Sequence, residues 1–216
     1  CTSDLQNFRE RIARIRELLA GDQPFSALAS DLDVQMRQLL RAEHLSLYRY
    51  DRHNREIVTV FTTSPLESVI RRPIGPSSIA GYVAHSGNTV RIANANDVEA
   101  RKAIHPRLQF GIGYENTGND MCKAMLVLPI LADDENVGVM QFINHPDESG
   151  FAPRDMLNAR ELALMIADRF AEEFRLSKHP YERLLERNLI TQAELANCAR
   201  KAKRLKRAIT DSRSEE

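Results

Sequence analysis

Cysteine is scarce in this chain of 216 residues, and Cys1, Cys122 and Cys198 lie far apart. Three widely spaced cysteines match neither a metal-binding motif nor an even set of disulfides, which favours a reducing, cytoplasmic environment. Lys and Arg total 30, as do Asp and Glu, so net charge does not argue for nucleic acid or membrane. No apolar run is long enough to span a bilayer, and the polar start Thr2–Gln6 is unlike a signal peptide.

Motifs for nucleotide hydrolysis and nucleic-acid binding are also missing. No loop of the form GxxxxGK[ST] occurs, so the chain carries no P-loop ATPase core. The basic run 200–207 has no interleaved aromatic residues to stack on bases, and such runs usually form a solvated helix face. Nucleic acid is therefore disfavoured as a partner.

What the chain does contain is helical periodicity at both ends of its first 175 residues. Apolar residues at helical spacing predict one helix before the break at Gly21–Pro24, a second after it, and a third from Pro153. The apolar positions are Leu5, Phe8, Ile12, Ile15 and Leu19, then Phe25, Leu28, Leu32, Met36, Leu39 and Leu40, then Leu157, Leu162, Met165, Ile166, Phe170 and Phe174.

Strand patterns fill the middle of the chain. Alternation in 45–50 and 57–63 around a polar turn predicts a β-hairpin, and 68–74 suits a third strand. The nearly continuous apolar runs 124–131 and 137–143 are expected at the centre of the sheet. Between these regions, 93–120 is polar and too irregular for a long helix or strand, which is typical of a functional loop.

The most informative segment is Ser77–Gly87, which predicts a short capped helix. The Ser78 hydroxyl suits an N-cap, and Gly87 suits the left-handed residue that ends a helix. Ile79, Tyr82 and Val83 share one helix face, which is expected to be buried. A short helix laid over a sheet in this way forms one wall of a small-molecule pocket.

The order of these elements resembles a GAF domain over about residues 22–175. The motifs that carry the resemblance are Ile79–Gly87 with Val90–Ile92, Met125–Ile130, Val137–Asn144, and Phe151 followed by Asp155. The resemblance implies an α+β, GAF-like (PAS-like) fold with an antiparallel sheet of about five or six strands. It implies terminal helices on one face of the sheet, and the pocket helix and loop on the other.

The pocket expected beneath the short helix mixes apolar and polar side chains, as small-molecule sites do. A ligand site in a sensor and a side-chain-filled cavity in a protein-interaction module are both consistent with this composition. The candidate ligand-binding residues are Ser78, Ile79, Tyr82, Asn94, Phe110, Tyr114, Asn116, Thr117, Asp120 and Met121.

Cyclic-nucleotide-binding GAF domains carry an Asn-Lys, a Phe and an Asp-Glu, and this chain departs from that set. Three of the five positions agree, whereas His145 replaces the lysine and Met156 replaces the glutamate. A histidine is not reliably charged near neutral pH, and methionine forms no ion pair. The departures argue against a cyclic nucleotide and favour a structural turn. The positions compared are Asn144, His145, Phe151, Asp155 and Met156.

Catalysis is disfavoured by the same scarcity of cysteine. A GAF-like family reduces free methionine sulfoxide, but that chemistry needs an attacking and a resolving cysteine, and only Cys122 lies near the pocket. Lys123 follows Cys122 where bilin-binding sites often have histidine. His85 and His105 are single, so no metal or haem site is expected. The chain is therefore expected not to be an enzyme.

The C-terminal part, 177–216, is predicted to be a basic helical extension. Its segment 184–195 resembles the N-terminal region of type II secretion and type IV pilus assembly ATPases, with Asn188 in place of their glycine. Domain boundaries are expected after residues 21 and 176. The resulting hypothesis is a cytoplasmic sensor domain of a secretion or pilus ATPase-like protein. It would dimerise through the apolar stripes of its terminal helices and contact that machinery.

Overall fold

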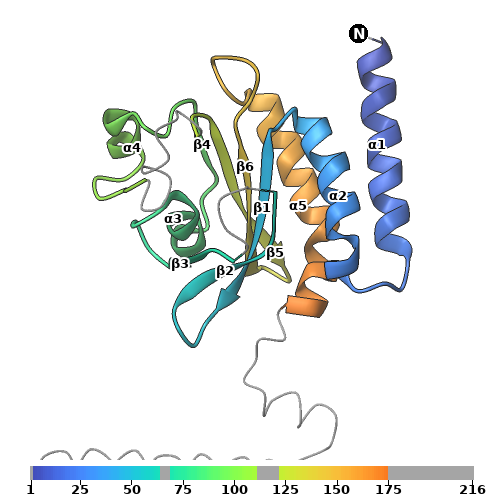
Figure 1. Cartoon of the computed structure of the whole chain (residues 1–216), viewed down its shortest axis with the longest axis horizontal. Coiled ribbons are helices and arrows are strands. Elements are labelled where there is room, and N and C mark those ends of the chain that lie inside the picture. Colours follow the sequence, from blue (N-terminus) through green and yellow to red (C-terminus); the bar gives the residue numbers. More distant parts are fainter. Residues whose placement is uncertain (1, 64–68, 111–121, 175–216) are drawn as a thin grey trace, which may run out of the picture. The chain divides into compact units, whose positions relative to one another are not determined.

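Six antiparallel strands form one sheet in the order β3-β2-β1-β6-β5-β4 in this computed structural model (Figure 1). The structure describes residues 2–63, 69–110 and 122–174. The predicted α+β fold, with an antiparallel sheet and helices on both faces, is confirmed. The strands are β1 (His44–Asp51), β2 (Glu56–Thr62), β3 (Arg71–Pro73), β4 (Val90–Ile92), β5 (Met125–Ala132) and β6 (Glu135–Ile143).

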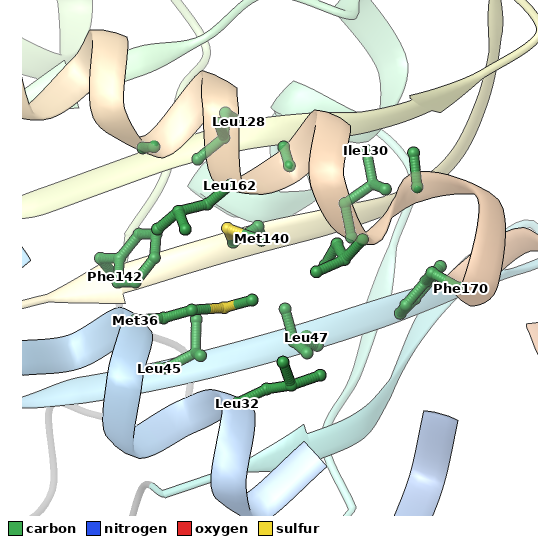
Figure 2. Close-up of a cluster of buried hydrophobic side chains, with 14 of the residues drawn as sticks. Leu32, Met36, Leu45, Leu47, Leu128, Ile130, Met140, Phe142, Leu162 and Phe170 are labelled. Carbon is green, nitrogen blue, oxygen red and sulfur yellow. The ribbon is translucent and has the colours of Figure 1, made fainter. Parts of the chain in front are cut away.

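Two helices, α2 (Phe25–Leu40) and α5 (Pro153–Phe174), cover one face of the sheet, and α1 (Thr2–Ala20) packs on the outer side of α2 (Figure 1). Figure 2 shows how Leu32 and Met36 of α2 and Leu162 of α5 lie over side chains of β1, β5 and β6. The core on this face also takes up Ile12 and Ile15 of α1, which are 6% and 0% exposed. The apolar stripe of the first helix therefore packs within its own domain.

The opposite face carries α3 (Ile79–Ser86) and α4 (Val98–Ile104) (Figure 1). Side chains alternate along each strand, so β6 sends Met140 and Phe142 to the core on the α5 side, and Val139 and Ile143 to the core on the α3 side. Helices on both faces explain why the strands read as nearly continuous apolar runs.

The structure refines three expectations about these elements. The run 137–143 forms a central strand, β6, as expected, but its partner at the centre is β1, and β5 lies between β6 and the edge strand β4, because a sheet covered on both faces gives no sequence signal of strand order. The loop 93–120 contains α4, which is only seven residues long and buries none of them, so it has no apolar stripe to detect. The strand expected at 68–74 is shorter, Arg71–Pro73.

Leu157 is also not part of the buried stripe of α5. It is 61% exposed, whereas Leu162 and Ile166 are fully buried. At roughly 100° per residue, Leu157 lies about 140° around the helix from Leu162, so it falls on the solvent side. Leu164, which is 68% exposed, lies seven residues further along on the same side. The extension 177–216 lies outside the described residues.

Candidate functional site

Helix α3 is positioned by the caps that the sequence predicts. The Ser78 hydroxyl accepts a hydrogen bond from the Gly81 N–H at 3.0 Å. Gly87 adopts the left-handed conformation, with φ 69°, and its N–H donates to the carbonyl of Val83 at 2.9 Å. Ile79 and Val83 are buried against the sheet, as expected, whereas Tyr82 is half-buried.

Direct backbone contact between α3 and the chain around β3 closes one side of the site. The Gly75 N–H donates to the carbonyl of Gly81 at 3.0 Å. A Cβ at Gly81 would lie 2.3 Å from the carbonyl oxygen of Pro73, a distance that no side chain tolerates. Gly81 is therefore required for this close approach.

A cavity of about 300 Å³ lies beneath the start of α3. Its floor is formed by side chains from β1, β5 and β6, one wall by β3, and its roof by the segment that caps α3. The mixture is typical of small-molecule sites, which combine apolar walls with a few polar groups. The lining residues are Tyr48, Arg71, Arg72, Pro73, Ser77, Ser78, Ile79, Ala80, Phe110, Met125 and Gln141.

Two polar side chains beside this space have no hydrogen-bond partner among the described residues. The Ser77 hydroxyl oxygen is inaccessible to solvent and forms no hydrogen bond. Gln141 is only 3% exposed, and its side-chain amide makes no hydrogen bond to another described residue. Buried polar groups are nearly always hydrogen-bonded, because leaving one unsatisfied costs about 1–3 kcal/mol. A polar atom in the cavity would have access to Gln141, which lines it, but not to the Ser77 hydroxyl oxygen, which is closed to solvent.

Comparison with known families identifies the fold. The family model for the GAF domain matches residues 27–174, most of the chain. The chain belongs to the GAF domain family. A comparison with curated protein sequences found no match.

Solved structures resemble this chain at low sequence identity. The GAF domain of a phosphoenolpyruvate-protein phosphotransferase from Coxiella burnetii is 20% identical, with a TM-score of 0.61, and the match covers 78% of this chain and 93% of that one. The corresponding domain from Acinetobacter is 17% identical, with a TM-score of 0.59 and coverages of 80% and 95%. Free methionine-R-sulfoxide reductase from Neisseria meningitidis, in complex with its substrate, is 21% identical, with a TM-score of 0.59 and coverages of 78% and 91%.

The GAF cavity includes some of the residues expected there from sequence. Ser78, Ile79 and Phe110 line it. Tyr82 instead packs against the ring of His105, with centroids 5.4 Å apart, and the Asn94 side chain accepts a hydrogen bond from the Asn96 N–H in a turn. The other candidates lie outside the described residues; they are Tyr114, Asn116, Thr117, Asp120 and Met121.

Sequence reasoning missed most of the sheet's contribution to the cavity. Tyr48, Met125 and Gln141 come from three strands, and their proximity depends on strand register. A signal existed for Gln141, because it is a polar residue inside the apolar run 137–143. The adjacent pair Arg71 and Arg72, at the cavity wall, was also overlooked.

The positions compared with cyclic-nucleotide-binding GAF domains lie between β6 and α5 and in the first turn of α5. Asn144 accepts from the Lys123 N–H at 2.8 Å and donates to Glu43 at 2.7 Å. Asp155 accepts from the Ala152 N–H at 2.7 Å, and Phe151 is buried in the core on the α5 side. None of the five positions lines the cavity.

Cys122 is buried just before β5, with 5% exposure. Burial, with the nearby charge of Glu43, raises the pKa of its thiol from 9.0 to about 12. At neutral pH the group is therefore a thiol rather than a nucleophilic thiolate. The described residues contain no cluster of three His, Cys, Asp or Glu side chains suited to a metal ion. Among the described helices, none is both long and apolar enough to cross a membrane.

Proposed function

We propose that this GAF domain is a regulatory sensor that binds a small molecule in the cavity beneath α3. The observation that carries the proposal is the cavity of about 300 Å³, where the Gln141 side chain, 3% exposed, makes no hydrogen bond to another described residue. A protein-interaction module with a filled cavity is the alternative. The space of about 300 Å³ favours the sensor, because a packed interior has few voids larger than water.

Filling the cavity tests this function. Ala80, which is 3% exposed, lines the cavity, so Ala80→Phe should occupy the ligand's space. Ala13 is exposed on α1, and Ala13→Phe provides the matched control. With wild type and Ala13→Phe, native mass spectrometry should find a co-purified small molecule, or a compound from a nucleotide and metabolite panel should raise the melting temperature. Ala80→Phe should show neither effect. No ligand in either assay would favour the interaction module.

We propose a binding role rather than catalysis. The support is chemical: reduction of a sulfoxide by cysteine needs two thiols, and Cys122 is a buried thiol with a raised pKa. Cys1 and Cys198 lie outside the described residues. The cytoplasmic location proposed from the scattered cysteines agrees with this binding role.

Dimerisation is retained as a proposal, but through α5 rather than α1. Leu157 and Leu164 are exposed seven residues apart on one side of α5, whereas the stripe of α1 is used internally. A second copy would bury them. Light scattering should give a dimer for wild type and a monomer for Leu157→Glu/Leu164→Glu, and a wild-type monomer at high concentration would refute the proposal.

The link to secretion or pilus assembly ATPases also remains a proposal. It is supported only by the sequence pattern of 184–195, which lies outside the described residues. We expect the full chain to capture secretion ATPase subunits in an affinity experiment, and we expect this capture to be lost when the sequence of 184–195 is scrambled. Capture that is absent, or that persists after scrambling, would contradict it.

A further inference from the structure

We infer that the ligand is a small organic anion with an apolar body, and that Arg72 and the first turn of α3 hold its anionic group. The inference rests on the proposed sensor function and names the chemical class of its ligand. It starts from the charges around the cavity, whose described lining residues include two arginines and no carboxylate.

The two arginines differ in how they are neutralised. Arg71 lies 3.5 Å from Asp51 and 3.4 Å from Glu56, and it is more than half exposed. Arg72 has no carboxylate within ion-pairing distance among the described residues, and its guanidinium donates only to the carbonyl of Arg71, at 3.0 Å. Arg72 pairs in register with Ile57, which belongs to the core on the α3 side. The unneutralised charge is thus on the cavity side of the sheet.

The start of α3 adds donors on the roof of the cavity. Ser78 occupies the Gly81 N–H through its hydroxyl and the Tyr82 N–H through its carbonyl. The N–H groups of Ile79 and Ala80 find no acceptor among the described residues. Free N–H groups and the helix dipole at an N-terminus favour an anion.

A buried polar side chain supplies an observation that is independent of the helix. Gln141 lines the cavity from the floor with 3% exposure, and its amide makes no hydrogen bond to another described residue. An amide N–H donates hydrogen bonds to the oxygens of carboxylates and phosphates. With Arg72 and the start of α3, Gln141 gives the cavity donors from three elements.

The remaining lining determines the rest of the ligand. Tyr48, Phe110 and Met125 present aromatic and thioether surfaces, which suit an apolar or planar body. The cavity, about 300 Å³, lies at the small end of ligand sites, so the body is the size of a single ring or a short chain. Carboxylate and phosphate share the required chemistry, and matched probes separate them.

NMR titration of the full chain with charge-matched probes tests the inference. The probes are phenylacetate against phenylacetamide, phenyl phosphate against phenol, and inorganic phosphate alone. At least one aromatic anion should shift the Ile79 and Ala80 amide signals, and its neutral counterpart should bind about tenfold to hundredfold more weakly. Inorganic phosphate, which lacks the apolar body, should also bind more weakly.

Two variants assign the charge to Arg72. Arg72→Gln should weaken binding of the anion by about tenfold or more, while Arg52→Gln, which removes the same charge from an exposed turn residue paired with Glu135, should not. Arg72→Lys should restore part of the affinity. If Arg72→Gln does not fold, the salt dependence of binding to the wild-type chain is the test. Raising the ionic strength should weaken binding of the anion and leave binding of its neutral counterpart unchanged.

The outcomes separate this inference from the function on which it rests. Equal binding of neutral and anionic probes, or unchanged affinity in Arg72→Gln, would overturn the anionic class while leaving a small-molecule sensor intact. Absence of binding by every probe, together with a co-purified neutral ligand, would overturn only the inference. Absence of both probe binding and any co-purified or stabilising ligand would overturn the sensor function as well.

Discussion

The phenolic hydroxyl of Tyr50 donates a hydrogen bond to the carbonyl oxygen of Ala84 across 2.5 Å. Ala84 lies in the last turn of α3, where carbonyl groups lack helical partners. Burial raises the pKa of Tyr50 well above its ordinary value, so the hydroxyl remains a donor at physiological pH. Strand β1 therefore fixes the end of α3 opposite to the end that roofs the cavity.

Removing this hydroxyl should loosen α3. Tyr50→Phe leaves the Ala84 carbonyl without that donor and should lower the free energy of unfolding by about 1 kcal/mol. Urea denaturation measures the change, and hydrogen exchange of the α3 amides should become faster. Tyr82→Phe is the matched control, because the Tyr82 hydroxyl has no described partner. An equal loss in both variants would show that the Tyr50 bond has no special role.

The close packing of α3 on the chain before it should make Gly81 intolerant of any side chain. Gly81→Ala places a Cβ against the backbone carbonyl of Pro73, which cannot move aside as a flexible side chain would. We expect a loss of about 1–3 kcal/mol in urea denaturation. Gly21→Ala introduces the same methyl group 3.7 Å from its nearest neighbour and should be tolerated. Wild-type stability of Gly81→Ala would contradict the packing.

Local sequence signals predicted the parts of the site that depend on neighbouring residues. Ser78 and Gly87 act through hydrogen bonds and backbone angles within α3, so sequence alone identified both. The floor of the cavity was not predicted, because Tyr48 and Gln141 meet only through the pairing of β1 with β6. Nothing in a single sequence fixes that register.

Short elements with no buried face are not predicted from sequence patterns for a different reason. Helix α4 is stabilised locally, with Asp97 accepting hydrogen bonds from the Glu99 and Ala100 N–H groups at 2.9 and 3.1 Å. The cap was visible in the sequence, but no apolar periodicity followed it. The exposed Leu157 is the opposite case, because it is an apolar residue in a helical pattern whose position, about 140° around the helix from Leu162, faces solvent.

Burial should protect Cys122 from thiol reagents. Its pKa of about 12 leaves very little thiolate at pH 8, and alkylation requires the thiolate. In a Cys1→Ser/Cys198→Ser chain, iodoacetamide should label Cys122 far more slowly in the folded protein than in urea, as measured by mass spectrometry. Labelling of the folded chain at the unfolded rate would contradict the buried, unreactive thiol and would revive a catalytic interpretation.

Asp51 should make folding sensitive to acid. Hydrogen bonds from Asn54, with the side-chain bond at 2.9 Å as the main cause, lower the pKa of the Asp51 carboxyl below its ordinary value. The folded state therefore favours the carboxylate, and this stabilisation is present above the unfolded pKa, about 4, and is lost as pH falls through the folded value. Asp51→Asn should lower the free energy of unfolding by about 0.2–1 kcal/mol at pH 7, and its stability should fall less steeply in acid than that of wild type. Asn54→Ala, which keeps the carboxylate but removes its main donor, should show the same weaker dependence on acid pH. Urea denaturation at a series of pH values measures this, and a wild-type pH dependence in both variants would refute the assignment.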